Sequence, residues 1–259
     1  MTPQIVTLTT DFGWKDHFAG MLKGALYSLI PGVTISDITH QVPPFDLQQG
    51  AYVLGHAWEV YPAGTIHLVC VGASPTRKFN HVAFEIAGHY FIGSNNGLFS
   101  LMTDLRPDTV YEICSAGKEP STFPALDVYV PVATALASGK KLDEIGHMTG
   151  PLAELLRPRH LPEDDVLKGN VIHIDSYGNL VTDIRRAEFD RIGQGREFAL
   201  QLVGDEISVI SARYSDVDEG DKLALFNSDD VLEIAINQGK ANQLLNLRIN
   251  AVIRIVFTS

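Results

Sequence analysis

The chain has 259 residues, of which 45% are hydrophobic and 20% charged, a composition typical of a soluble globular protein with one large domain or two modest ones. Its 20 basic and 31 acidic residues give a formal charge of −11, which argues against a nucleic-acid partner because the phosphates would be repelled. No apolar run reaches the length of a membrane span, so we expect a cytoplasmic protein with no membrane partner.

The first half alternates strand and helix patterns, which predicts an α/β domain with a mainly parallel sheet. The expected elements are a strand at 5–9, a helix at 18–29, a strand at 33–38, a helix capped by Asp46, strands at 65–71, 82–86, 90–92 and 110–114, and a helix at 128–137. In the helix at 18–29, the pattern places Phe18, Met21, Leu22, Ala25 and Leu29 on one face.

The second half follows a polar segment with two prolines and no periodicity, which we interpret as a linker at 156–166 between domains 1–155 and 167–259. Its pattern of short strands predicts a small β-barrel-like domain. The expected strands are 169–175, 180–184, 197–202, 206–211, 222–226 and 249–257. The two cysteines, Cys70 and Cys114, form no metal-ligand pattern, so we expect reduced buried thiols and no metal.

Several motifs stand out along the whole chain. They are Thr9-Thr10-Asp11-Phe12-Gly13, Ser36-Asp37-Ile38-Thr39-His40, Asp175-Ser176-Tyr177-Gly178-Asn179, Asn227-Ser228 and Glu233-Ile234-Ala235. Together they resemble the S-adenosylmethionine (SAM) hydroxide adenosyltransferases and the related fluorinases and chlorinases, from Ile5 to about Ala241. The resemblance implies a nucleoside ligand, with SAM as substrate or ligand and no further cofactor.

Asp11 follows a predicted strand, at the edge where open α/β sheets bind ligands. A carboxylate there can accept both hydroxyls of a ribose diol, although the same residues also suit a turn with a helix-capping Asp. The resemblance implies the ribose-binding role for Asp11 and places Asp16, Phe45 and Thr122 near the ligand. Asp16 also suits a solvated first helical turn, and Phe45 a hydrophobic staple before the helix capped by Asp46.

In the second half, Asp175 and Asn179 form either a simple hairpin turn or a binding turn. An Asn amide can donate to and accept from an adenine edge, and an Asp suits an ammonium group. The resemblance implies these roles, and it directs Ser228 and Glu233 to the amino-acid tail of SAM. Asn227 belongs to the same motif and Asn237 lies close behind, although a strand–turn–strand with polar caps would look similar.

The sequence departs from the family pattern where the catalytic Asp and His are expected. Gly72 stands at the Asp position and Pro124 at the His position, while Arg77 remains as the candidate catalytic residue. Gly72 and Pro124 can neither orient a water molecule nor accept its proton. Ala125 stands where the halogenases carry a Ser, so their halide pocket is not reproduced.

We therefore expect a SAM- or adenosine-binding member of the family, attacking C5′ of SAM if active, with activity weak or lost. SAM hydrolysis by a rearranged base stays open, and so does a non-catalytic nucleoside sensor or oligomeric scaffold. The resemblance also implies a homotrimer in which Asp11 of one subunit lies near Asn179 and Ser228 of the next.

Overall fold

The computed structural model describes residues 4–73, 80–113, 121–156, 165–202 and 204–258. The chain divides into two compact units, residues 1–157 and 158–259. Of the expected linker, residues 157–164 lie outside the described part of the chain. Among the described residues, no helix is both long enough and apolar enough to cross a membrane.

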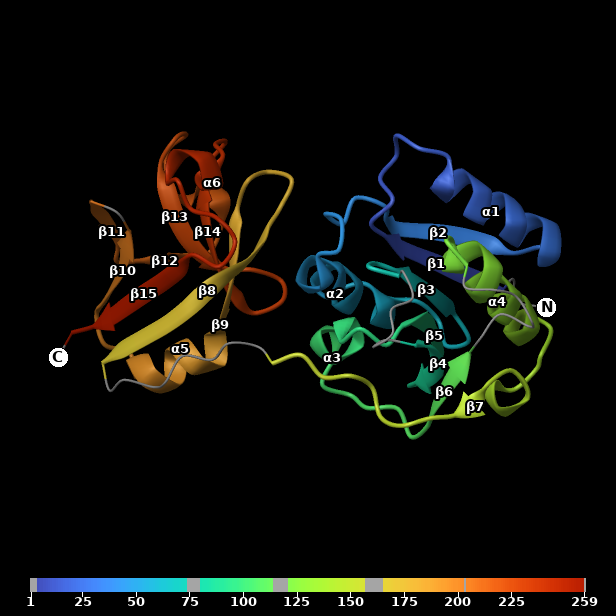
Figure 1. The fold of residues 1–259 in the computed structure, drawn as a ribbon. Coiled ribbons are helices and arrows are strands. Elements are labelled where there is room, and N and C mark those ends of the chain that lie inside the picture. The colour runs from blue at the N-terminus through green and yellow to red at the C-terminus, as the bar shows by residue number, and fades with distance from the viewer. Residues whose placement is uncertain (1–3, 74–79, 114–120, 157–164, 203, 259) are drawn as a thin grey trace. The chain divides into compact units, whose positions relative to one another are not determined.

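The N-terminal unit is a sheet covered by helices on both faces (Figure 1). Its elements are β1 (Ile5–Thr10), α1 (Phe18–Leu29), β2 (Thr34–Thr39), α2 (Leu47–Gly55), η1 (Trp58–Val60), β3 (Ile66–Cys70), β4 (His81–Ile86), β5 (His89–Ser94), α3 (Leu98–Met102), β6 (Val110–Ile113), η2 (Ala125–Tyr129), α4 (Val130–Ala137), η3 (Leu142–Glu144) and β7 (His147–Met148).

The seven strands run in the order β2-β1-β3-β5-β4-β6-β7. The pairs β1–β2, β1–β3 and β3–β5 are parallel, whereas β4–β5, β4–β6 and β6–β7 are antiparallel. The expectation of a mainly parallel sheet is therefore wrong, because the sheet is mixed. Ala87 and Gly88, both at positive φ, join β4 to β5 in a tight hairpin, and so short a connection permits only antiparallel pairing.

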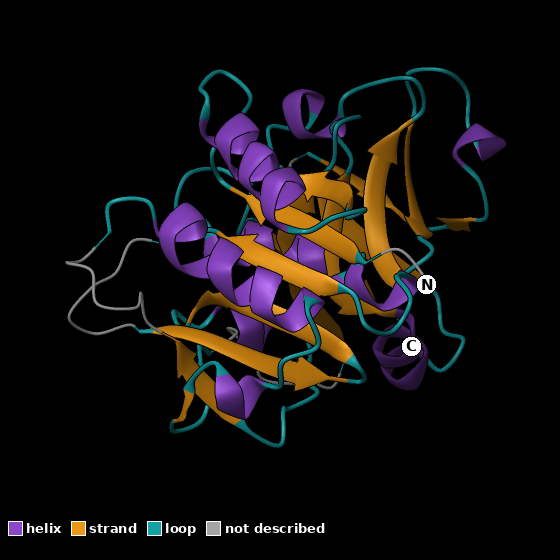
Figure 2. Cartoon of the chain, turned by 90° about the vertical axis from the view of Figure 1, so that its right-hand side faces the viewer, coloured by secondary structure: helices purple, strands orange, loops and turns teal. Residues whose placement is uncertain are grey.

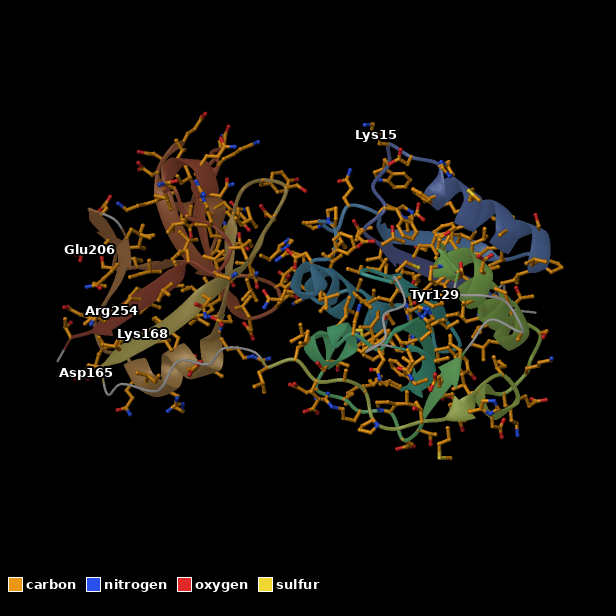
Figure 3. All side chains as sticks on the ribbon, in the orientation of Figure 1. Lys15, Tyr129, Asp165, Lys168, Glu206 and Arg254 are labelled. Carbon is orange, nitrogen blue, oxygen red and sulfur yellow. The ribbon has the colours of Figure 1, made fainter. Side chains whose placement is uncertain are left out.

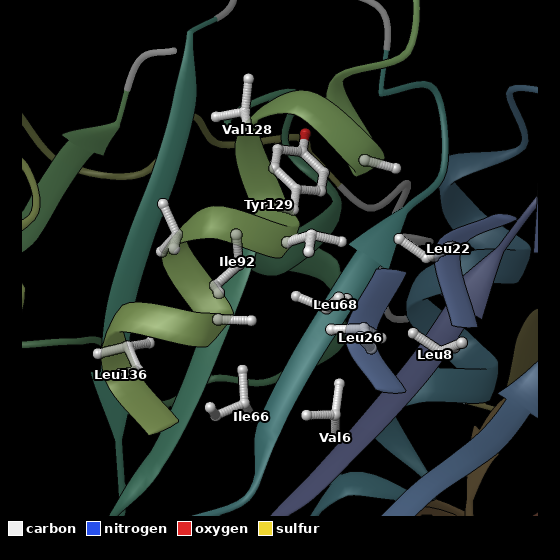
Figure 4. Packing of buried hydrophobic residues seen from close by; sticks show 14 of the residues in the cluster. Val6, Leu8, Leu22, Leu26, Ile66, Leu68, Ile92, Val128, Tyr129 and Leu136 are labelled. Carbon is white, nitrogen blue, oxygen red and sulfur yellow. The ribbon is translucent and has the colours of Figure 1, made fainter. Parts of the chain in front are cut away.

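Two apolar clusters hold this unit together, one on each face of the sheet. Helices α1 and α4 lie side by side over one face (Figures 1 and 2), where Leu22, Leu26, Tyr129 and Leu136 pack against strand residues (Figure 4). Helices α2 and α3 cover the other face, in the second cluster. Helix α2 begins as expected, because Asp46 accepts a hydrogen bond from Gln49 N at 3.0 Å.

The expected face of helix α1 is partly wrong. Its buried residues are Ala19, Leu22 and Leu26, whereas Phe18, Met21 and Leu29 are exposed. The helix carries apolar residues on several of its sides, so their spacing does not by itself identify the buried face.

The C-terminal unit is one coiled eight-strand sheet, in the order β11-β10-β15-β8-β9-β14-β13-β12. Its elements are β8 (Val166–Ile174), β9 (Leu180–Arg185), α5 (Arg186–Gly193), β10 (Phe198–Leu202), β11 (Asp205–Ile207), β12 (Ile210–Ser211), η4 (Tyr214–Asp216), β13 (Lys222–Phe226), β14 (Val231–Ile236), α6 (Ala241–Leu244) and β15 (Val252–Phe257). The two edge strands β11 and β12 are separated by only residues 208–209, and β11 also contacts β13, so the sheet is nearly closed into a barrel.

Candidate functional site

The carboxylate of Asp11 lies directly after β1 and links the ends of three neighbouring strands. Its Oδ2 accepts hydrogen bonds from the backbone N–H groups of Phe45 and Gly72, both at 3.0 Å. These donors stand in the loops that follow β2 and β3, which flank β1 in the sheet. No residue in the described part of the chain donates to Oδ1, so this oxygen can accept hydrogen bonds from a ligand.

Both donors adopt an unusual backbone conformation. Phe45 has φ of 65° and Gly72 has φ of 56°, in the left-handed region. For Phe45 this conformation costs about 1–2 kcal/mol. It directs the N–H group to Asp11 and leaves the ring 73% exposed, so the Phe45 ring is available to a ligand beside the carboxylate.

The side-chain amide of Asn96 fixes the loop that carries Gly72. Its Nδ2 donates to the carbonyls of Val71 at 3.0 Å and Gly72 at 3.4 Å, and its Oδ1 accepts from Leu98 N at 3.2 Å. The sole sequence signal for this role was the Asn-Asn-Gly tripeptide, which is equally typical of simple turns.

The segment after residue 120 packs against the Asp11 turn through aromatic rings. The centroids of Phe12 and Phe123 lie 5.5 Å apart, which brings the neighbours Asp11 and Thr122 to the same region. Thr122 is exposed there. Ser121 Oγ donates to Asp127 Oδ2 at 2.5 Å and accepts from Phe123 N at 2.9 Å, so this turn is internally fixed.

Pro124 stands immediately before η2 and supplies no proton-transferring group. Arg77, the candidate catalytic residue, lies outside the described residues. Asp16 is exposed on the loop before α1, next to Lys15 at the surface (Figure 3).

Cys70 ends strand β3 beneath Asp11. Burial, reinforced by the nearby Asp11 carboxylate, raises the pKa of the Cys70 thiol, which therefore stays protonated and is a poor nucleophile. Cys114 lies outside the described residues.

In the C-terminal unit, Asp175 organises the turn between β8 and β9. Its Oδ1 accepts from the backbone N–H groups of Tyr177 at 2.9 Å and Asn179 at 2.8 Å. Its Oδ2 accepts from Asn179 Nδ2 at 3.0 Å. The two predicted residues are therefore brought together, and Asp175 holds the buried Asn179 amide in a fixed orientation. Among the described residues, none is hydrogen-bonded to the side-chain oxygen or the second side-chain N–H of Asn179.

A second cluster surrounds the buried carboxylate of Glu233 on β14. Oε1 accepts from the Tyr214 hydroxyl at 2.7 Å, and Oε2 accepts from Asn227 Nδ2 at 3.3 Å. Burial, followed by the hydrogen bond and charge of Glu233 and the charge of Asp175, raises the pKa of Tyr214. Sequence reasoning missed Tyr214, because it is 19 residues from Glu233 and belongs to no motif.

The other two predicted residues in this unit lie apart from that carboxylate contact. Ser228 is exposed in the turn between β13 and β14. Asn237 Nδ2 donates to the Val217 carbonyl at 2.9 Å, so its amide fixes the loop before β13.

Comparison with known proteins shows the family of this chain. Residues 6–146 match the SAM hydroxide adenosyltransferase N-terminal domain and residues 169–254 match the C-terminal domain. The chain belongs to the SAM hydroxide adenosyltransferase family. The family recognised from the motifs is thus confirmed.

Individual relatives resemble the chain over nearly their whole length. An (R)-S-adenosyl-L-methionine hydrolase of Thermus thermophilus is 29% identical, with 97% of this chain and 99% of the relative covered. A fluorinase of an Actinoplanes species is 24% identical, with 97% of each covered. A solved structure of an uncharacterized conserved protein from Thermotoga maritima superposes with a TM-score of 0.87 at 28% identity, covering 98% of this chain and 100% of that one.

Proposed function

We propose that this protein binds the adenosine part of SAM and that its hydrolysis of SAM is weak. In that reaction water attacks C5′, the C5′–sulfur bond breaks, and adenosine, methionine and one proton are released. The observation that carries the proposal is the Asp11 carboxylate, which is held by two backbone donors through one oxygen and presents the other for a ribose diol.

The weak activity follows from the residues around this carboxylate. Gly72 and Pro124 occupy the places where a water-activating Asp and His are expected, and neither has a side chain that can accept a proton. The loss of a general base costs roughly 10²–10⁴ in rate. The neutral Cys70 thiol does not replace it.

We propose further that adenine contacts the Asn179 amide, that the amino-acid tail of SAM contacts Asp175 and the region of Ser228, and that Asn227 and Glu233 shape this region. The proposal includes a homotrimer whose neighbouring subunits share each site, with SAM or adenosine as the small-molecule partner, no additional cofactor and a cytoplasmic location. The buried position of Glu233, bonded to Tyr214 and Asn227, supports a shaping role for this carboxylate.

One experiment tests binding and chemistry separately. Purified protein is titrated with SAM and with adenosine by calorimetry, and a parallel incubation with SAM is assayed for adenosine and methionine. We expect binding of both ligands and slow product formation. A ligand at 100 times its dissociation constant should stabilise the fold by about 2.7 kcal/mol, measured as a rise in melting temperature.

The Asp11→Asn variant tests the role of the Asp11 carboxylate, because Asn keeps the shape of the side chain and removes its charge. Its affinity for adenosine should fall, while the Asp104→Asn control, exposed on the loop between α3 and β6, should bind like the wild type. No binding of SAM or adenosine at millimolar concentration by the wild type would refute the proposal.

A further inference from the structure

A chain of polar side chains runs from the outer edge of the sheet to the Asp11 turn. His40 Nδ1 lies 2.8 Å from Thr10 Oγ1, and its Nε2 lies 3.2 Å from Asp37 Oδ1. Asp37 also pairs with Lys23 of α1. Thr10 and His40 are completely buried, so water does not compete for the contact between them, whereas Asp37 is partly exposed.

The groups around His40 favour one tautomer of the neutral imidazole. Phe12 N donates to Thr10 Oγ1 at 3.3 Å, and the Asp37 carboxylate faces Nε2 of His40, which favours a hydrogen on Nε2 and donation from the Thr10 hydroxyl to Nδ1. The proton of a neutral His40 then stands on Nε2, facing Asp37. That contact is bent rather than linear, so its attraction is chiefly electrostatic.

Burial keeps the His40 ring neutral near pH 7. Burial lowers the pKa of His40, and Lys23 lowers it further, whereas Asp37 acts in the opposite direction. A protonated ring would carry a hydrogen on Nδ1 as well, and Thr10 would have to turn its own proton away from His40. With a neutral ring, the hydrogens of Thr10 and His40 therefore both point along the row of side chains toward Asp37.

The same histidine holds both ends of the turn that contains Asp11. Its side chain fixes Thr10, the residue before Asp11, and its backbone carbonyl accepts from Gly13 N at 2.7 Å. The Trp14 ring lies edge-on against the imidazole, with centroids 4.5 Å apart. Asp11 thus stands between two residues that His40 fixes.

We propose that Asp37, His40 and Thr10 are positioning residues that set the direction of the Asp11 carboxylate toward the ribose diol. The inference rests on the proposed function, because it assigns these three side chains a role in nucleoside affinity as well as in the stability of the protein. A purely structural role would change the melting temperature and leave the preference for a diol unchanged.

The test measures that preference as the ratio of two affinities. Adenosine and 2′,3′-dideoxyadenosine, which lacks both ribose hydroxyls, are titrated into the full-length protein by calorimetry. For the wild type we expect adenosine to bind about 10- to 100-fold more tightly, as for hydrogen bonds to a charged group.

The matched pair of variants is Thr10→Val and Thr10→Ser. Val has the shape of Thr without the hydroxyl, so the ratio should fall by about fivefold or more, whereas Ser restores the hydroxyl and should restore the ratio. In an Asp11→Ala background, Thr10→Val should have no further effect on the ratio, because the two residues act through one contact.

Asp37→Asn provides a second test if Thr10→Val does not fold, since Asp37 is partly exposed and lies at the outer end of this row of polar side chains. Its ratio should fall while the protein stays folded. If folded Thr10→Val or Asp37→Asn keeps the affinity ratio of the wild type, the positioning role is overturned and the proposed function is not affected. A wild type that binds adenosine without any preference for the diol would overturn the role of Asp11 and this inference together, and no binding at all would overturn the proposed function as well.

Discussion

His67 should make the N-terminal unit sensitive to acid. The ring is completely buried on β3, with Nδ1 2.7 Å from Thr7 Oγ1 and Nε2 3.1 Å from His89 Nδ1. It stacks on Phe91 with ring centroids 4.7 Å apart. Burial, with a smaller contribution from His89, lowers the pKa of His67 to about 3.

The sign and size of the effect follow from linkage between proton binding and folding. The pKa of His67 is about 6.5 in the unfolded chain and about 3 in the folded one, so the unfolded state binds the proton more tightly. The stability that the neutral ring contributes is complete above pH 6.5 and is lost as the pH falls toward 3. Between pH 8 and pH 4.5 the loss should be about 3 kcal/mol.

The assay is urea unfolding followed by tryptophan fluorescence at several pH values. Both tryptophans of the chain, Trp14 and Trp58, lie in the N-terminal unit, so the signal reports on the unit that contains His67. In His67→Gln, which cannot titrate, the free energy of unfolding should fall less steeply with acid, by about 1 kcal/mol per pH unit below pH 6.

The control is His147→Gln, because His147 is exposed on β7. Its pH dependence should match that of the wild type. If His67→Gln loses stability with acid as steeply as the wild type does, the burial argument for His67 is wrong. A lower stability of His67→Gln at neutral pH is expected and does not bear on the slope, because Thr7 and His89 lose part of their hydrogen bonding.

Three further predictions concern the site and the assembly. Tyr214→Phe removes a donor to the buried Glu233 carboxylate and should lower the free energy of unfolding by about 1–3 kcal/mol, measured by urea denaturation; an unchanged value would show that water replaces the hydroxyl. Gly72→Asp combined with Pro124→His should raise SAM turnover by more than the product of the single changes, by about 100-fold if a general base is restored, and turnover equal to the wild type would contradict this. An Asp at position 72 adopts a strained φ near 56°, but its Cβ lies at an ordinary 3.4 Å from Asn96 Nδ2 and Leu47 Cδ2, so the protein should still fold. Sedimentation should give a mass three times that of the 28.3 kDa chain, whereas a stable monomer would refute the trimer.

The sequence by itself determined the features that depend on neighbouring residues. The family was readable from short motifs, and the helix capped by Asp46 followed from a local hydrogen bond. The turn at Asp175 was also readable, because an Asp, a Gly and an Asn at this spacing favour a turn. These signals act within a few residues of the chain and need no knowledge of the fold.

Only the tertiary structure decided which distant groups meet. The order of the strands placed Tyr214 against Glu233 and His40 against Thr10, across 19 and 30 positions of the chain. Two backbone loops met on Asp11 for the same reason. Side-chain periodicity fixes which face of an element is apolar, but not which neighbour covers it, and in α1 it did not fix even the buried face. Hydrogen bonds between distant segments depend on strand order and direction, which no local pattern specifies.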